Sequence, residues 1–237
     1  MQNVKLIVLD VDGTLTDGTL LYTDSGAQSK AFHVADGLGI VMAQAVGIRI
    51  AILSGRTSRV VETRMAELGV EDVIQNCGDK AQVLNELLEK YHLRAKEAAY
   101  VGDDINDLPA FEAAGVKIAV ANASEHLKTR ADWVTPRAGG AGAVRDAIEE
   151  ILRRQGRLDE AVAAYLARTK LEEGTARLET NENVLLAFWP RVVTAAMHTT
   201  MIRASMTAYS TAVGPSSRLR NLTMFLVMER MVRPREG

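Results

Sequence analysis

Two aspartates near the N-terminus have the types and the spacing to do chemistry. Asp10 and Asp12 follow the apolar run at residues 4–9, so they lie where a buried strand would meet its first turn. Paired carboxylates there can hold a hard divalent cation, leave one oxygen free to attack phosphorus and let the other move a proton. For these residues alone, an acidic turn that merely ends a strand is the alternative, and the rest of the chain decides.

Polar residues follow two further predicted elements. Ser54 ends the apolar run at residues 50–53, and its hydroxyl and the amides of the Gly55–Arg56 turn could donate hydrogen bonds to phosphate oxygens. Lys80 begins a predicted helix, where a compact ammonium would neutralise both a nucleophile and a phosphate. Taken singly, Ser54 also suits a helix cap, and Lys80 also suits a solvated surface.

A second acidic group lies later in the chain. Asp103 and Asp104 follow an apolar run at residues 99–101 and the tight Gly102, and Asp107 comes one helical turn later. Three acids crowded at a strand end repel one another unless a cation or a lysine lies among them. We therefore favour a metal site for this group.

The elements that must position these residues alternate between short β-branched runs and helical patterns. Such alternation predicts an α/β fold, a Rossmann-like parallel sheet with helices on both faces. Ligands of such folds gather at the carboxyl ends of the strands, where the residues above lie. We expect strands near residues 4–9, 48–53, 98–101, 117–120 and 132–134, and helices near residues 37–45, 58–68, 80–91, 105–113, 124–130 and 141–155.

Residues 19–34 interrupt this alternation. Two apolar runs, at residues 20–22 and 31–34, flank a turn at residues 24–26, which is the pattern of a β-hairpin inserted after the acidic turn. We predict a small flap over the site in place of a cap domain. The predicted organisation is one domain at residues 1–156 with the flap at 19–34, followed by a helical C-terminal extension of unknown role at 157–237.

The C-terminal part differs in composition from the rest. From Thr180 onward there are seven Arg, three Glu and no Lys or Asp, and six of the nine Met lie there. Arginines interrupt its apolar clusters before they reach the roughly 18 residues that a spanning helix needs, so we predict no membrane span. Two amphipathic helices broken near Gly214 and Pro215 are expected, packed on the domain or at a subunit contact, with attachment to a membrane surface as an alternative.

The overall composition excludes several classes of protein. Of the 237 residues, 47% are apolar and 24% charged, and the formal net charge is −2. These values fit an ordinary globular protein and show no charge bias toward nucleic acid. Cys77 is the only cysteine, which excludes an internal disulfide and fits a reducing compartment. Because the first predicted strand follows Met1 so closely, no signal peptide fits there, and we expect a cytoplasmic protein.

The motifs taken together resemble those of the haloacid dehalogenase superfamily of phosphatases, over about residues 4–155. They are Asp10-x-Asp12-Gly-Thr, Ser54, Lys80 and Gly102-Asp103-Asp104-x-x-Asp107. The resemblance implies that Asp10 attacks phosphorus and forms an aspartyl phosphate, while Asp12 protonates the leaving alcohol and then deprotonates the hydrolytic water. It also implies that Ser54 and Lys80 hold the phosphoryl oxygens.

The same resemblance implies a magnesium cofactor. Mg²⁺ would be held by Asp10, the backbone carbonyl of Asp12 and Asp103, with substrate phosphate and waters completing an octahedron. Asp104 would act through bound water, and Asp107 would orient the lysine.

Three segments narrow the resemblance to the 3-deoxy-D-manno-octulosonate 8-phosphate phosphatase family. They are Phe32-x-Val34-x-Asp36-Gly37-x-Gly39-Ile40, residues 54–69, and Ala138-Gly139-Gly140-x-Gly142-Ala143-Val144-Arg145. Members of that family lack a large cap and form tetramers in which a neighbouring subunit helps to close the site. The resemblance therefore implies a homotetrameric hydrolase of lipopolysaccharide biosynthesis that acts on a small sugar-acid phosphate. The C-terminal tail departs from the family, which leaves the tetramer open.

The carboxylate of such a substrate would give an arginine a task, because a guanidinium can bind a carboxylate through two hydrogen bonds. Arg56 and Arg64 are the candidates, with a surface ion pair as the alternative for each. Arg56 favours the eight-carbon substrate over a nine-carbon, sialic-acid-type phosphate or another small phosphate ester. A further alternative is a non-catalytic interaction module that acts through the tail. The intact Asp10 and Asp12 argue against this alternative.

Overall fold

Six parallel strands form the central sheet of the protein. The computed structural model describes residues 1–26 and 28–170, all of them within the compact unit Met1–Glu172. The strand order is β5-β4-β1-β6-β7-β8, with every pairing parallel. The strands are β1 (Leu6–Leu9), β4 (Arg49–Leu53), β5 (Asp72–Ile74), β6 (Ala98–Gly102), β7 (Val116–Ala119) and β8 (Trp133–Val134).

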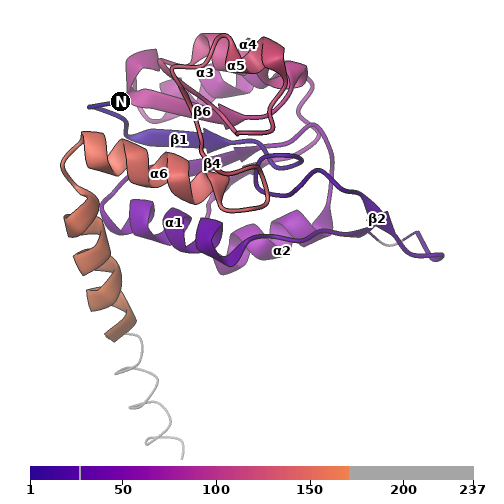
Figure 1. Ribbon diagram of the computed structural model, residues 1–237, viewed down its shortest axis with the longest axis horizontal. Coiled ribbons are helices and arrows are strands. Elements are labelled where there is room, and N and C mark those ends of the chain that lie inside the picture. The colour runs from indigo at the N-terminus through magenta and orange to yellow at the C-terminus, as the bar shows by residue number, and fades with distance from the viewer. Residues whose placement is uncertain (27, 171–237) are drawn as a thin grey trace, which may run out of the picture. The chain divides into compact units, whose positions relative to one another are not determined.

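Helices cover both faces of this sheet, with α3, α4 and α5 on one side and α1, α2 and α6 on the other (Figure 1). They are α1 (Val34–Ala45), α2 (Arg59–Glu67), α3 (Lys80–Lys90), α4 (Leu108–Ala113), α5 (Glu125–Lys128) and α6 (Ala143–Arg154), with 3-10 turns η1 (Ala95–Glu97) and η2 (Ile105–Asp107). The predicted α/β fold with a parallel sheet is confirmed.

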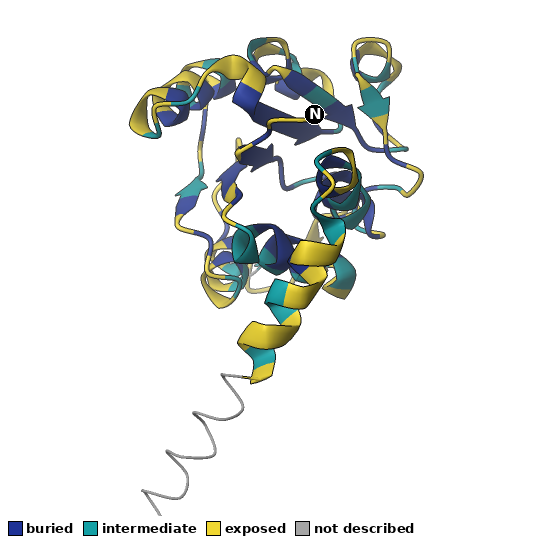
Figure 2. Cartoon of the chain, turned by 90° about the vertical axis from the view of Figure 1, so that its left-hand side faces the viewer, coloured by how far each residue is buried: buried dark blue, intermediate teal, exposed yellow. Residues whose placement is uncertain are grey.

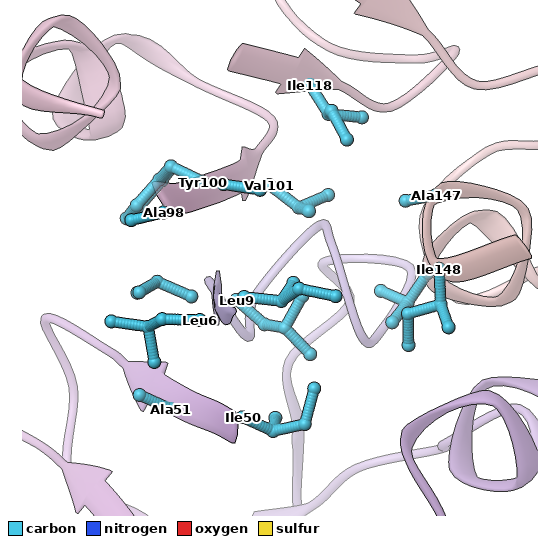
Figure 3. Packing of buried hydrophobic residues seen from close by; sticks show 14 of the residues in the cluster. Leu6, Leu9, Ile50, Ala51, Ala98, Tyr100, Val101, Ile118, Ala147 and Ile148 are labelled. Carbon is cyan, nitrogen blue, oxygen red and sulfur yellow. The ribbon is translucent and has the colours of Figure 1, made fainter. Parts of the chain in front are cut away.

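The central strands are apolar throughout because both of their faces are covered. Every residue of β1 and of β6 is buried, as expected for parallel strands that lie between two layers of helices. Ala147 and Ile148 of α6 face Leu9 and Val101 of the sheet (Figure 3). Each large aliphatic side chain buried in this way contributes about 1.5–3 kcal/mol. Buried positions lie on the strands and the inner sides of the helices, and exposed positions lie outside (Figure 2).

The sequence prediction lacks β5, for which there is a physical reason. This strand has three residues, lies at the edge of the sheet and contains Asp72, a residue type that is depleted in strands. Two neighbours compensate the carboxylate, since Lys90 Nζ donates to Asp72 Oδ1 at 2.6 Å and the Tyr91 hydroxyl donates to Asp72 Oδ2. Those partners come from the end of α3, so only the folded chain supplies them.

The insertion after β1 is a short antiparallel hairpin, called the flap below, formed by β2 (Leu21–Tyr22) and β3 (Gln28–Ser29). Its returning strand ends earlier than predicted, and the helix expected from residue 37 begins at Val34. His33 caps the start of this helix, because its Nδ1 accepts a hydrogen bond from the Ala35 amide at 3.3 Å. The apolar residues 31–34 therefore lead into a helix rather than form a strand.

The chain continues beyond α6 as a further helix at residues 158–170. Ala161 of this helix is fully buried and belongs to the core, and Leu158 and Tyr165 pack against it. The two amphipathic helices expected in the tail, and the rest of the predicted extension from residue 171, lie outside the described residues. Within the described part of the chain, no helix is long and apolar enough to cross a membrane.

Candidate active site

Three adjacent strands bring the predicted site residues to one edge of the sheet. Leu9 of β1 lies opposite Ile52 of β4 and Val101 of β6 in the parallel register. The residues that follow these strands, including Asp10, Ser54 and Asp103, therefore emerge at the same carboxyl edge, where ligands of open α/β sheets bind.

A buried ion network lies at this edge. Lys80 Nζ donates to Asp10 Oδ1 at 2.6 Å and to Asp107 Oδ1 at 2.6 Å. The side chains of Lys80, Asp10 and Asp107 are only 3%, 5% and 0% exposed. Lys80 is the first residue of α3, which Asp79 caps by accepting from the Gln82 amide at 3.0 Å. The cap therefore sets where the helix starts and where this ammonium points.

Asp107 is held on every side by hydrogen bonds. The buried Tyr100 hydroxyl donates to Asp107 Oδ1 at 2.8 Å. The amides of Asp103 and Asp104 donate to Asp107 Oδ2 at 3.0 and 3.4 Å. With Lys80 as a further donor, both oxygens of Asp107 already have protein partners. This residue therefore positions the lysine and the Asp103 loop.

Burial and crowding perturb the ionisation of the cluster. Burial raises the pKa of Asp10 to about 8, the charge of Asp107 adds to this rise, and Lys80 opposes it. Burial and the charges of Asp107 and Asp104 raise the pKa of Asp103 to about 6. Burial alone would lower the pKa of Lys80, but the charges of Asp10 and Asp107 outweigh it and raise that pKa. A nearby cation would therefore stabilise the ionised form of each acid.

The cluster has the donors that a hard divalent cation prefers. Carboxylate oxygens of Asp10, Asp103 and Asp107 all lie within 4.8 Å of one another. Because the oxygens of Asp107 are taken by protein donors, Asp10 and Asp103 are the carboxylates available to a metal. All-oxygen ligands of this kind suit Mg²⁺, so the residues present fit the cofactor that the motifs imply.

Gly13 allows the two acidic loops to approach each other. Its φ of +98° lies in the left-handed region, and a Cβ built on it would come within 2.0 Å of Asp103 Oδ2. Any side chain at position 13 would be strained and would push Asp103 away. The neighbouring Thr14, which was not predicted as a site residue, contacts the same carboxylate, with its Oγ1 at 3.5 Å from Asp103 Oδ1.

Ser54 and the turn after it lie beside this cluster. Ser54 is 2% exposed, its amide donates to the Ile74 carbonyl at 3.0 Å, and its Oγ accepts from the Arg56 amide at 3.2 Å. The helix cap considered for Ser54 belongs instead to Ser58, which precedes α2. Gly55 is exposed, and Arg56 Nη2 donates to the Tyr22 hydroxyl of the flap at 3.3 Å.

Arg64 does not join the acidic cluster. Its Nη1 donates to Glu67 Oε2 at 3.0 Å within α2, which is the surface ion pair considered as its alternative. It also lines a pocket with Phe32, Val60, Thr63 and Glu67, between α2 and the end of the flap. Of the two candidate arginines, Arg56 is therefore the one that belongs to the turn after Ser54.

Lys30 is a second site residue, besides Thr14, that the sequence did not predict. It follows β3, and its Nζ donates to Asp12 Oδ1. The side chain of Lys30 is 1% exposed and that of Asp12 is 20% exposed. No sequence signal marks this contact, because a lysine next to a strand of an exposed hairpin ordinarily faces solvent.

Two of the segments that carry the family resemblance, residues 32–40 and 138–145, contact each other. Asp36, in the first turn of α1, accepts at Oδ1 from the Arg145 amide at 2.7 Å, in the first turn of α6. The loop before α6 lies against the Asp10 loop, since the Gly140 amide donates to the Thr14 carbonyl at 3.2 Å. These segments therefore support the loop that carries Asp10.

Comparisons with known proteins agree with this geometry. Residues 70–148 match the family model of haloacid dehalogenase-like hydrolases. A 3-deoxy-D-manno-octulosonate 8-phosphate phosphatase from Escherichia coli K12 is 44% identical over 160 residues, which cover 68% of this chain and 85% of the relative. The chain therefore belongs to the haloacid dehalogenase-like hydrolase family. The phosphatase of the same name from Haemophilus influenzae is 41% identical over 157 residues, 66% of this chain and 87% of that relative.

Solved structures of this hydrolase family show the same fold. The Moraxella catarrhalis 3-deoxy-D-manno-octulosonate 8-phosphate phosphatase, crystallised with magnesium, phosphate and the sugar acid, superposes with a TM-score of 0.67 at 40% identity, covering 69% of this chain and 94% of that one. The cobalt-bound enzyme from Haemophilus influenzae gives a TM-score of 0.66 at 40% identity, covering 70% and 98%. The superfamily predicted from the motifs is confirmed.

Proposed function

We propose that this hydrolase is a Mg²⁺-dependent phosphatase that cleaves the phosphate monoester of a sugar acid, 3-deoxy-D-manno-octulosonate 8-phosphate. The observation that carries the proposal is the buried Asp10–Lys80–Asp107 network, with Asp103 beside it, at the strand ends of a chain 44% identical to a phosphatase of that name. In this function the protein serves lipopolysaccharide biosynthesis.

The reaction proceeds through an aspartyl phosphate. An oxygen of Asp10 attacks phosphorus and forms a new P–O bond, and the bond to the sugar oxygen breaks with its electron pair on that oxygen. Asp12 donates a proton to the sugar oxygen and the alcohol leaves. Water then attacks phosphorus and gives its proton to Asp12, and the bond to Asp10 breaks. Free carboxylate, inorganic phosphate and a reprotonated Asp12 result, so the cycle closes.

The other residues of the site hold the reactants in place. Lys80 favours the ionised form of Asp10 and fixes the direction of its carboxylate, and Asp107 fixes Lys80. The Ser54 hydroxyl and the amides of the Gly55–Arg56 turn bind phosphoryl oxygens, and Asp104 acts through bound water. When bound, Mg²⁺ supplies charge neutralisation to the phosphoryl group.

We propose that the protein distinguishes sugar phosphates by the carboxylate of the substrate. Arg56 adjoins the phosphate-binding turn and its guanidinium contacts Tyr22 of the flap, so it can take a carboxylate at the mouth of the site through two hydrogen bonds. Arg64 lines the pocket beside Phe32, and we propose that it contacts the sugar part of the same substrate. The role of Arg56 requires an acidic sugar rather than a neutral one.

Phosphate release from purified full-length protein tests the function. We expect turnover of 3-deoxy-D-manno-octulosonate 8-phosphate in the presence of Mg²⁺, its loss with a chelator, and weaker turnover of a nine-carbon sugar-acid phosphate and of a neutral hexose phosphate. Asp10→Asn should abolish turnover with the fold retained, because an amide cannot become the acyl phosphate. Equal rates on neutral and acidic sugars would contradict the substrate assignment, and undiminished activity of Asp10→Asn would contradict the mechanism.

The assembly and the location also belong to the proposal. We propose a cytoplasmic homotetramer in which a neighbouring subunit helps to cover the site, with residues 1–156 as the catalytic domain and residues 157–237 as an extension. The flap supports a subunit contact, since Leu21 and Tyr22 are 56% and 55% exposed. Sedimentation of the full chain, and of a variant with both residues changed to Ser, would test this contact.

A further inference from the structure

The flap carries a buried charge into the active site. Lys30 lies directly after β3, between Ser29 and Ala31, which are both exposed. Its own side chain is only 1% exposed. Removing an ammonium from water costs several kcal/mol unless a partner compensates it. The partner is Asp12, whose Oδ1 accepts a hydrogen bond from Lys30 Nζ.

This partner is the residue that must exchange a proton twice in each cycle. Asp12 follows Asp10 in a turn whose backbone is fixed, but its side chain is 20% exposed at the mouth of the site. Several rotamers would therefore be open to it without a contact that holds one of them. Lys30 supplies that contact at Oδ1 and leaves Oδ2 to face the leaving oxygen or the hydrolytic water. Correct orientation of a reacting group lowers the barrier by several kcal/mol.

We propose that Lys30 is a positioning residue of the phosphatase reaction, which acts by holding the Asp12 carboxylate in the orientation for proton transfer. The inference rests on the proposed function and deepens it. Because Lys30 belongs to the flap, the order of the flap determines the order of Asp12. A displaced flap would leave the nucleophile Asp10 in place, since that residue is held by Lys80 from α3, but it would impair the proton transfers.

Two substrates separate this role from direct binding of phosphate. An alkyl phosphate needs a proton on its leaving oxygen, whereas p-nitrophenyl phosphate has a stable phenolate as its leaving group and needs none. Hydrolysis of the aspartyl phosphate needs Asp12 with either substrate. A variant with a misplaced Asp12 should therefore release the first p-nitrophenolate normally in a burst and then turn over slowly.

The test compares Lys30→Met, Lys30→Arg and a matched control, Lys5→Met. Lys5 also pairs with a buried carboxylate, that of Glu97 at 2.7 Å, but it lies before the first residue of β1, at the end of the strand opposite the site. We expect Lys30→Met to lower kcat on the sugar phosphate by about 100-fold while KM changes by less than about threefold. Its burst with p-nitrophenyl phosphate should keep the wild-type rate, and Lys5→Met should keep kcat.

Partial recovery of kcat in Lys30→Arg supports positioning, since a guanidinium also reaches a carboxylate, and it provides the test if Lys30→Met fails to fold. A burst rate that falls as far as kcat, or a KM that rises as far as kcat falls, would show that Lys30 acts on the substrate, and the inference would be overturned. An unchanged kcat would overturn it as well. Failure of the wild-type protein to release phosphate from either ester would instead refute the proposed function.

Discussion

Replacing Gly139 by Ala tests whether the loop before α6 holds the catalytic loop in place. The Gly139 amide donates to Asn122 Oδ1 at 2.8 Å, which holds the glycine in place. A Cβ built on Gly139 would lie 1.7 Å from the carbonyl oxygen of Gly13 and 3.1 Å from the Thr14 amide nitrogen. Both nearby atoms are backbone, so no flexible side chain can make room.

The size of the effect follows from these distances. Ordinary van der Waals contact begins at 3.4 Å, so the catalytic loop and the glycine must separate by about 1.7 Å. Gly13 adjoins Asp12, and a displacement of about 1 Å at a reacting group lowers the rate by about 100-fold. We expect kcat/KM to fall by at least that factor. Overpacking of this kind also destabilises by about 1–3 kcal/mol.

A matched control separates displacement from loss of stability. Gly47 has a φ of +80° with no atom within 4 Å of the added Cβ, so Gly47→Ala strains the backbone by about 1–2 kcal/mol without moving the site. Both variants should unfold a few degrees lower, whereas only Gly139→Ala should lose activity. Phosphate release and thermal unfolding of both proteins measure this. Equal activities of the two variants would refute the argument that this loop positions Asp12.

Two further predictions concern metal binding by Asp103 and the pH dependence of stability that Glu97 causes. Asp103→Asn removes one of the two carboxylates available to the metal and should weaken Mg²⁺ binding by about tenfold or more in calorimetry. Asp24→Asn, in the exposed flap turn, should leave the Mg²⁺ affinity unchanged. Equal affinities of the two variants would show that Asp103 is not a ligand. Hydrogen bonds from Lys5 and Arg94 lower the pKa of Glu97 to about 2. Glu97 therefore stabilises the fold above its unfolded pKa, and this contribution is lost as pH falls from about 4.5 toward 2. Glu97→Gln should lower the unfolding midpoint near neutral pH and leave it unchanged near pH 2, and a constant difference at both would contradict this linkage.

The sequence was sufficient to predict which residues meet at the sheet edge, because position along a strand decides that placement. Asp10 and Asp103 each follow an apolar run, which predicts a buried strand, and parallel strands align their carboxyl ends. Lys80 could be placed in the same way, since a capping aspartate precedes it at the start of α3. None of these inferences required knowledge of a contact between distant side chains.

Contacts that depend on side-chain packing across elements could not be predicted. Lys30 reaches Asp12 only because the hairpin returns at one register, and no residue near it signals which side it faces. Asp36 has the composition of a cap for α1, yet it bonds to the first turn of α6, more than a hundred residues later. The edge strand β5 was missing for a related reason, since its aspartate is tolerated through partners that α3 supplies.

The charges of the buried network support a divalent rather than a monovalent cation. Asp10, Asp103 and Asp107 contribute three carboxylates, and Lys80 is the ammonium that faces them. The set is therefore short of two positive charges, which is the charge of one Mg²⁺. In the protein alone, burial first and then the charges of the neighbouring acids raise the pKa values of Asp10 and Asp103, so that protons would partly offset the missing charge. Lys30 contacts Asp12 rather than the three carboxylates of the cluster, so the flap can hold the proton-transfer residue without competing for the metal.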